Sequence, residues 1–168
     1  MPHHLMGKGW NGFDAFAASG DLTEDGRPDL LVRQASTGFL FLYRGSTNAG
    51  FEPAVKVGSG WKGWTIIGAE DLTGDGHGDL LARDPGGEVW RYDGKGAGRF
   101  KPRKLVFSDW GAGRKEIIAV GDVTGDSLCD LISRDTNGKL LRNQGDGKGS
   151  FGATVTVGTG LQNYRALF

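Results

Sequence analysis

The sequence predicts an all-β protein built from three consecutive copies of one unit of about 50 residues. The first observation is an acidic loop with aspartate at positions 1, 5 and 9, which begins at Asp21 and recurs at Asp71 and Asp122. The second is that no window is convincingly helical, because apolar residues alternate or form short runs that glycine interrupts. The third is the glycine content, 31 of 168 residues, which is typical of a chain with many tight turns.

Each unit contains four predicted strands in a fixed order. The acidic loop continues into a short apolar strand that ends in arginine, predicted at residues 30–33, 80–83 and 131–134. A glycine turn closes a hairpin to a second strand, predicted at 39–44, 88–93 and 139–144. A third strand follows one phenylalanine, at 55–57, 105–107 and 155–157, and a fourth short apolar strand leads into the next loop.

Four short antiparallel strands in about 50 residues match the size of one β-propeller blade. We expect residues 10–168 to form a single repeat domain, after an N-terminal segment 1–9 that is either native or a remnant of cloning. The expected blades are residues 10–60, 61–109 and 110–160, with an additional copy of one strand at 161–168. A β-trefoil-like three-fold domain is the alternative, although it does not explain the aspartate loops.

Three blades are fewer than the four to eight of closed propellers. An open arc exposes apolar end faces and unpaired strand edges, which proteins in water avoid. We therefore expect either a homodimer that joins two arcs head to tail into a six-bladed ring, or further blades of a longer parent chain. In the dimer, the additional strand of one copy completes a blade that the other copy begins.

The acidic loops predict binding sites for a hard cation, because three carboxylates within nine residues repel one another unless a cation lies among them. Glycine at position 6, Gly26 and Gly76, permits a left-handed bend around the ion, whereas Ser127 is strained there by about 1 kcal/mol. We expect about three calcium sites with dissociation constants of roughly 10⁻⁴ to 10⁻³ M, the third being the weakest. The alternative is that these aspartates only cap turns with backbone donors.

These loops and the strands after them resemble the FG-GAP and VCBS-type repeats of integrin-like β-propellers and secreted bacterial proteins, especially the actinobacterial form. Residues 71–83 show the pattern best, as Asp-Leu-Thr-Gly-Asp-Gly and then Asp-Leu-Leu-Ala-Arg, and the resemblance covers nearly all of residues 10–168. It implies a carbonyl ligand at position 7 and a side-chain ligand at position 3, where threonine replaces the familiar asparagine or aspartate. The implied ligands are Asp21, Thr23, Asp25, Arg27 and Asp29 in loop 1, Asp71, Thr73, Asp75, His77 and Asp79 in loop 2, and Asp122, Thr124, Asp126, Leu128 and Asp130 in loop 3.

Composition argues against several classes of protein. Lysine plus arginine and aspartate plus glutamate each number 20, and no basic stripe is present, so we expect no nucleic-acid partner. The segment has no apolar run long enough to span a membrane and no signal peptide. A single cysteine, Cys129, excludes an internal disulfide. No unrepeated catalytic cluster stands out, so we expect no enzyme activity.

Aromatic residues provide the candidate ligand site. Trp10, Trp61 and Trp110 share one repeat position, and Trp64 follows three residues after the second of them. These rings either fill the contacts between blades or form stacking platforms for sugars at blade junctions. The arginines that end the first strand, Arg33, Arg83 and Arg134, either serve the same sites or anchor a loop carboxylate.

Together these features predict a calcium-stabilised, non-catalytic binding module that is secreted and recognises a glycan or a protein. A purely structural or assembly scaffold is the first alternative. A fragment of a secreted hydrolase is the second alternative.

Overall fold

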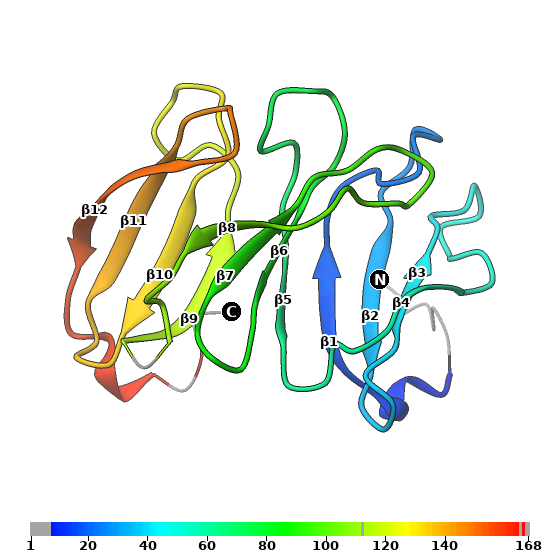
Figure 1. Ribbon diagram of the computed structural model, residues 1–168, viewed down its shortest axis with the longest axis horizontal. Coiled ribbons are helices and arrows are strands. Elements are labelled where there is room, and N and C mark those ends of the chain that lie inside the picture. Colours follow the sequence, from blue (N-terminus) through cyan, green and yellow to red (C-terminus); the bar gives the residue numbers. More distant parts are fainter. Residues whose placement is uncertain (1–7, 112, 165, 167–168) are drawn as a thin grey trace, which may run out of the picture.

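The computed structural model describes residues 8–111, 113–164 and 166, which form three four-stranded antiparallel sheets (Figure 1). Blade 1 contains β1 (Phe13–Ala18), β2 (Leu30–Gln34), β3 (Leu40–Tyr43) and β4 (Val55–Gly58). Blade 2 contains β5 (Thr65–Gly68), β6 (Leu80–Arg83), β7 (Val89–Tyr92) and β8 (Lys104–Phe107). Blade 3 contains β9 (Arg114–Ala119), β10 (Leu131–Asp135), β11 (Leu140–Gly145) and β12 (Phe151–Gly158).

The all-β prediction is confirmed. Helical structure in the described residues is confined to two short 3₁₀ turns, η1 (Trp10–Gly12) and η2 (Leu161–Asn163). Most of the predicted N-terminal segment 1–9 and part of the predicted additional strand 161–168 lie outside the described residues. No described helix has the length and apolar character needed to cross a membrane.

The three sheets repeat one register. Leu30 pairs with Tyr43, Leu80 with Tyr92 and Leu131 with Asn143, so the same strand positions face each other in every blade. The predicted hairpin glycines Gly38, Gly87 and Gly138 have φ values of 67°, 95° and 78°, which side chains other than glycine rarely adopt. The repeat period and its glycines therefore predicted the blade-like unit correctly.

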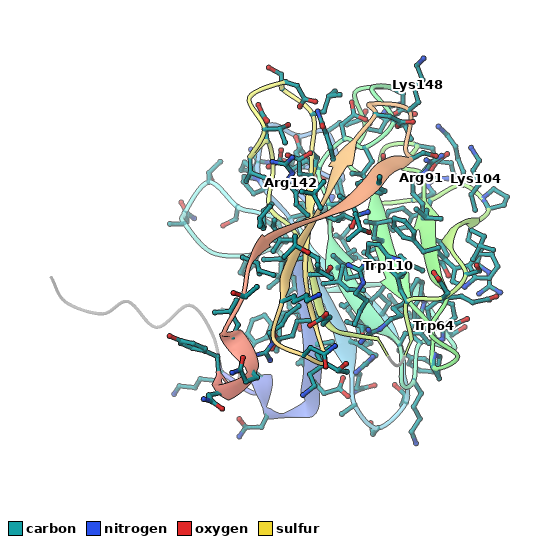
Figure 2. All side chains as sticks on the ribbon, turned by 90° about the vertical axis from the view of Figure 1, so that its left-hand side faces the viewer. Trp64, Arg91, Lys104, Trp110, Arg142 and Lys148 are labelled. Atoms are coloured by element: carbon teal, nitrogen blue, oxygen red, sulfur yellow. The ribbon has the colours of Figure 1, made fainter. Side chains whose placement is uncertain are left out.

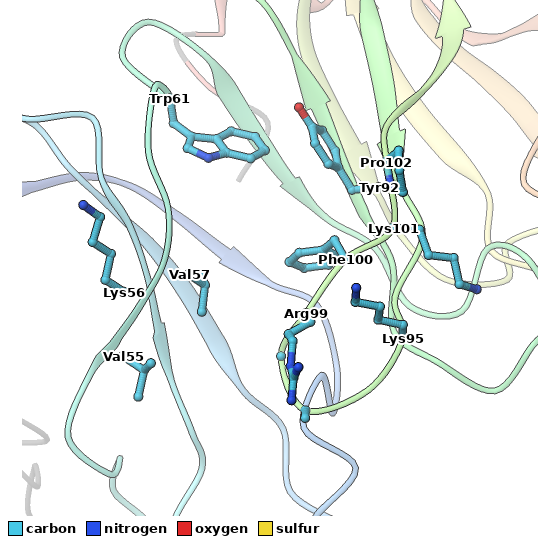
Figure 3. A pocket seen from close by; sticks show the side chains of 12 residues that line it. Val55, Lys56, Val57, Trp61, Tyr92, Lys95, Arg99, Phe100, Lys101 and Pro102 are labelled. Atoms are coloured by element: carbon cyan, nitrogen blue, oxygen red, sulfur yellow. The ribbon is translucent and has the colours of Figure 1, made fainter.

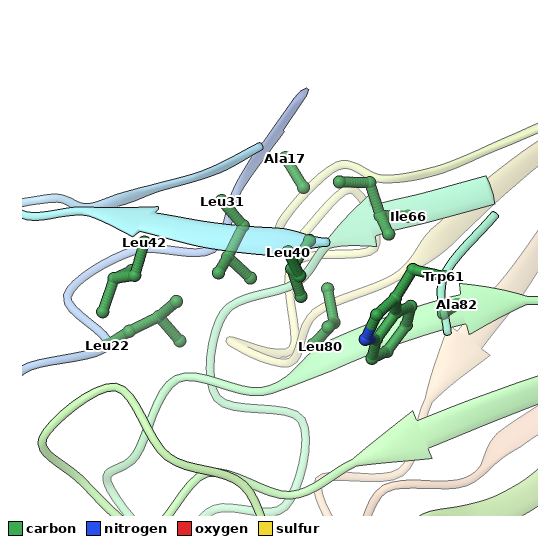
Figure 4. Close-up of a cluster of buried hydrophobic side chains, with 9 residues drawn as sticks. All are labelled: Ala17, Leu22, Leu31, Leu40, Leu42, Trp61, Ile66, Leu80 and Ala82. Carbon is green, nitrogen blue, oxygen red and sulfur yellow. The ribbon is translucent and has the colours of Figure 1, made fainter. Parts of the chain in front are cut away.

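Neighbouring blades pack face to face through apolar side chains, with β1 beside β5 and β5 beside β9 (Figure 1). We call the contact between two neighbouring blades a seam. At the first seam, between blades 1 and 2, Leu31 and Leu40 belong to one buried cluster with Trp61 and Leu80 (Figure 4). A matching cluster forms the second seam, between blades 2 and 3, from Leu81, Val89, Trp110 and Leu131 among others. Each fully buried leucine contributes about 1.5–3 kcal/mol, so the seams supply much of the stability.

Arg33 in β2 and its equivalent Arg83 in β6 cross to the next blade and bind backbone carbonyls there. Arg33 Nη1 donates to the carbonyls of Trp61 (3.3 Å) and Trp64, and its Nε donates to Asp14 (2.8 Å). At the second seam, Arg83 donates in the same way to Trp110 (3.2 Å) and Arg114. The backbone of the following aromatic segment is therefore anchored to the blade before it.

A second arginine adds to the seam between blades 2 and 3. Arg91 of β7 donates to the carbonyls of Lys148 (3.2 Å) and Gly149 in blade 3 (Figure 2). It also pairs with Asp93, which lies 2.8 Å from Lys104 Nζ. Burial acts to raise the pKa of Asp93, but these two cations hold it below its usual value.

Residues 161–164 occupy the place beside blade 3 that the aromatic segment takes at the other seams. Arg134 donates to the carbonyls of Leu161 (2.9 Å) and Tyr164, as Arg33 does to Trp61 and Trp64. The Leu161 amide also donates to Gly138 (2.9 Å), which corresponds to the bond from Trp61 to Gly38 (3.0 Å). Residues 161–163 are thus a turn equivalent to η1 rather than a strand.

Replacing Arg33 by methionine tests the first seam. Arg33→Met keeps much of the apolar stem but removes the arginine donor from the Trp61 and Trp64 carbonyls and from Asp14, so we expect a loss of about 2–3 kcal/mol in urea unfolding. Lys139→Met on the exposed hairpin of blade 3 is the control and should change the free energy of unfolding by less than about 0.5 kcal/mol. Equal stability of the two variants would contradict a structural role for the arginine.

Candidate functional site

The first aspartate of each loop organises the loop backbone. Asp21 accepts hydrogen bonds from the amides of Glu24 (2.7 Å), Asp25 (3.2 Å) and Gly26 (2.7 Å). Asp71 and Asp122 make the same three bonds in loops 2 and 3. Burial acts to raise the pKa of Asp21, but these amide donors hold it below its usual value. Turn capping, the alternative reading of the loops, is thus present in the structure.

The ninth aspartate is buried and fastens the loop to the rest of its blade. Asp29, Asp79 and Asp130 are 3%, 0% and 0% exposed. One oxygen accepts an amide near the loop start, from Thr23 (2.9 Å), Leu72 (2.9 Å) and Val123 (3.1 Å) respectively. The other accepts the amide of a glycine after the second hairpin strand, from Gly45 (3.0 Å), Gly94 (2.8 Å) and Gly145 (3.0 Å). Burial raises the pKa of Asp79 despite the backbone amides that donate to it.

Loop 1 has a geometry that fits a calcium ion. Asp21, Asp25 and Asp29 each offer a carboxylate oxygen, and these oxygens lie within 4.8 Å of one another. Calcium–oxygen distances are about 2.3–2.6 Å, so ligands on opposite sides of one ion lie roughly 4.6–5.2 Å apart. In loop 3, the hydroxyl of Thr124 at position 3 is buried without a hydrogen-bond partner among the described residues. In loop 1 the carboxylates at positions 1, 5 and 9 are therefore close enough to share one cation, besides capping the turn.

The loops differ in backbone strain. Position 6 is left-handed in all three, with φ of 83° at Gly26, 82° at Gly76 and 66° at Ser127, as the sequence predicts. Position 4 is left-handed as well, which the sequence analysis did not anticipate, and loop 1 has Glu24 there with a φ of 65°. Loops 1 and 3 thus each hold one strained residue, at about 1 kcal/mol, whereas loop 2 has glycine at both positions.

The middle aspartate of each loop receives a different polar partner. Its outer oxygen accepts from Arg27 (3.0 Å) in loop 1, Lys101 (2.8 Å) in loop 2 and Gln144 (2.7 Å) in loop 3. Lys101 holds the pKa of Asp75 below its usual value. The His77 side chain, at position 7 of loop 2, contacts Glu24 of loop 1.

The aromatic and arginine residues predicted to bind a ligand lie mainly at the seams. Trp61 and Trp110 are 9% and 5% exposed, whereas Trp10 and Trp64 are partly exposed. Trp110 stacks on Phe107, with ring centroids 3.6 Å apart. The guanidinium groups of Arg33, Arg83 and Arg134 are engaged with backbone carbonyls, so their geometry supports a role in joining blades.

A groove of about 750 Å³ opens on the surface at the first seam (Figure 3). One wall is β4 of blade 1, with Val55 and Val57, and the other contains Trp61, Tyr92 and Phe100 of blade 2. The Trp61 and Tyr92 ring centroids are 5.0 Å apart, and those of Tyr92 and Phe100 are 6.4 Å apart. Sequence reasoning singled out Trp61 but not the other two rings, because they lie far along the same blade and approach Trp61 only in the folded structure.

A basic turn, residues 94–101, forms the rim of this groove. Lys95 and Arg99 are exposed, and none of the residues lining the groove is acidic. The turn is hydrogen-bonded to loop 1, since the Gly98 amide donates to the Leu22 carbonyl (2.8 Å). The position of the rim therefore depends on the conformation of the neighbouring aspartate loop.

Comparison with known proteins identifies the class of repeat. The model of the FG-GAP-like repeat family matches residues 21–82 and 71–133, and each match runs from one aspartate loop past the next. These matches cover more than half of the chain, so the chain belongs to the FG-GAP-like repeat family. No curated protein matches the sequence.

A solved structure with a similar fold is that of a lectin from Agrocybe aegerita, which specifically recognises non-reducing terminal N-acetylglucosamine. The two share 28% sequence identity with a TM-score of 0.60. The similarity covers 83% of this chain but 37% of the lectin chain, so this chain spans little more than a third of the lectin's length. The fold and the repeat family fit a β-propeller-like binding module.

Proposed function

We propose that this chain is a calcium-stabilised, non-catalytic carbohydrate-binding module that works outside the cell. The observation that carries this proposal is the groove at the first seam, where Trp61, Tyr92 and Phe100 line one wall. Sugar rings present apolar C–H faces that pack against aromatic rings, while polar groups at the rim fix their orientation. The similar lectin supports a carbohydrate as the ligand, because that lectin has a similar fold and recognises a sugar.

The proposed calcium ligands are those implied by the resemblance in each loop, with the carboxylates at positions 1, 5 and 9 as the strongest. Calcium, when bound, supplies the positive charge that offsets the mutual repulsion of these groups. Loop 1 then acts on the groove through the bond from Gly98 to Leu22, which holds the basic turn in place. Calcium binding in loop 1 should therefore order the rim of the groove.

The lining of the groove supports the non-catalytic part of the proposal. None of its lining residues is a histidine, cysteine, aspartate or glutamate, and carboxylates are the usual acid, base and nucleophile of glycoside hydrolases. A structural scaffold is the second candidate, and the arginine bridges at the seams favour it. The two candidates differ in whether the chain binds any ligand.

Calcium should stabilise the folded chain. With dissociation constants of roughly 10⁻⁴ to 10⁻³ M, about 10 mM calcium should add roughly 1.4–2.7 kcal/mol per occupied site and raise the melting temperature relative to chelator. Asp25→Asn should reduce this shift, because it removes a carboxylate of the loop 1 cluster, whereas Asp109→Asn outside the loops should leave it unchanged. An identical transition with calcium and with chelator would remove calcium from the proposal.

A glycan panel in calcium tests the binding function. We expect at least one saccharide to bind, and Phe100→Leu to weaken it about three- to tenfold by removing an aromatic face from the groove. Phe151→Leu is the matched control, since Phe151 holds the same repeat position in blade 3, stacks with Phe107 and lies outside the groove. Failure of every saccharide to bind would leave the scaffold as the better function.

We also propose self-association, because the outer face of blade 1 is aromatic. Trp10 contacts Phe13, Phe16 and Tyr43, and Phe16 is 50% exposed. The matching face of blade 2 is the one that packs under blade 1. A second copy that docks its first blade on blade 3 meets residues 161–164, which already occupy that place, so closure of a ring requires this segment to be exchanged or displaced.

Light scattering of the whole chain and of a chain ending at residue 160 tests this association. We expect a mass near twice 17.9 kDa, with the dimer tighter in the shortened chain because the place beside blade 3 is then open. Monomers in both cases, at concentrations up to about 1 mM, would contradict self-association.

A further inference from the structure

We propose that the groove at the first seam takes an acidic saccharide, whose carboxylate or sulfate group is held by Lys95 and Arg99 beside the aromatic wall. This inference rests on the proposed function, because it names the class of carbohydrate that the groove binds. Three observations support the inference. The rim of the groove is positively charged, its cations occur in blade 2 but not in the other two blades, and the equivalent groove at the second seam is closed.

Two cations of the rim, Lys95 and Arg99, are not held in an ion pair with any described residue, although the Glu24 carboxylate lies against Gly96 of the same turn. Lys56 lies beside the groove, but its Nζ sits 3.2 Å from the centre of the Phe39 ring. Lys101 is paired with Asp75 at 2.8 Å. Lys95 and Arg99 form no ion pair within the described part of the chain, although the chain as a whole has no net charge. The groove therefore concentrates positive charge on an otherwise balanced protein.

The two cations are held close together by the turn that carries them. The Lys95 amide donates to the Arg99 carbonyl (3.1 Å), and the Arg99 amide donates to Gly96 (3.2 Å). Figure 3 shows both side chains beside Phe100 on the same loop. An arginine and a lysine at one end of an aromatic wall suit a sugar with an anionic substituent, since guanidinium groups bind carboxylate and sulfate oxygens with paired donors.

The fold does not require these cations, because the other blades lack them. The matching turns run from Gly45 to Phe51 and from Gly145 to Phe151, each closed by the same bridge or strand pairing. At the positions of Lys95, Arg99 and Lys101, blade 1 has Ser46, Gly50 and Glu52, and blade 3 has Asp146, Ser150 and Gly152. A cluster present in one copy of a repeated unit points to a task outside the repeat itself.

The equivalent groove at the second seam is closed. Asn143, buried at 2% exposure, replaces the tyrosine, and Phe107 stacks on Trp110 where a sugar ring would lie. Its turn carries one acid and one base, Asp146 and Lys148, in place of two cations. Among the described seams, the first alone combines an open aromatic wall with a basic rim.

Calorimetric titration in calcium with four oligosaccharides tests the proposal. They are a uronic acid oligomer, its neutral methyl ester, a sulfated oligomer of a neutral sugar, and a chitin oligomer. We expect one or both acidic probes to bind at least tenfold more tightly than the ester and the chitin oligomer, and to lose affinity as sodium chloride is raised. The uronic and sulfated probes decide which anionic group is preferred.

The double variant Lys95→Gln with Arg99→Gln should lower affinity for the acidic probe at least tenfold and leave the melting temperature unchanged. Lys139→Gln with Lys148→Gln on blade 3 removes the same charge elsewhere and should leave binding unaltered. Equal affinity for the uronic oligomer and its ester would overturn the acidic preference while the carbohydrate-binding function stands. Polyglutamate binding as tightly as the uronic oligomer would overturn the saccharide class, and no saccharide binding at all would overturn both.

Discussion

A buried carboxylate at the ninth loop position is the constraint on which each blade depends. A carboxylate removed from water needs hydrogen-bond partners, and Asp79 finds them in the amides of Leu72 and Gly94. This one carboxylate therefore holds together three segments of blade 2: the start of the loop, the strand β6 that follows it, and the turn after β7. Because the turn beyond Gly94 is the basic rim, the same carboxylate that shapes the loop also places the cations of the groove.

One scaffold thus produces two different seams. Aromatic residues occupy equivalent positions in both, yet Phe107 stacks on Trp110 and closes the second seam, whereas Gly58 at the position of Phe107 leaves the first seam open over Trp61. The difference arises from the outer strand of the earlier blade, which has glycine at this position in blade 1 and phenylalanine in blade 2. A ligand site in this architecture is therefore a property of two neighbouring blades rather than of one repeat.

The fold was predictable because its signals are local: glycines with positive φ, apolar strands of regular spacing, and loops with a fixed pattern of aspartates. The partners of Arg33 were not, because backbone carbonyls some 30 residues away leave no mark on the sequence. The left-handed Glu24 was missed since nothing about glutamate indicates that conformation. The groove could not be predicted, because its walls, with Val57 and Trp61, come from different blades. The sequence does show its basic rim, because Lys95 and Arg99 have no counterpart in the other two copies of the repeat.

The arginine bridges have a consequence for how such a chain can evolve. Arg33, Arg83 and Arg134 recognise the main chain, so the residue at the anchored position is free to be Trp61, Trp110 or Leu161. A unit duplicated in the gene carries both its own arginine and the backbone that its neighbour's arginine binds. New copies can therefore join an existing array at once, and their surfaces can diverge afterwards without breaking the joints.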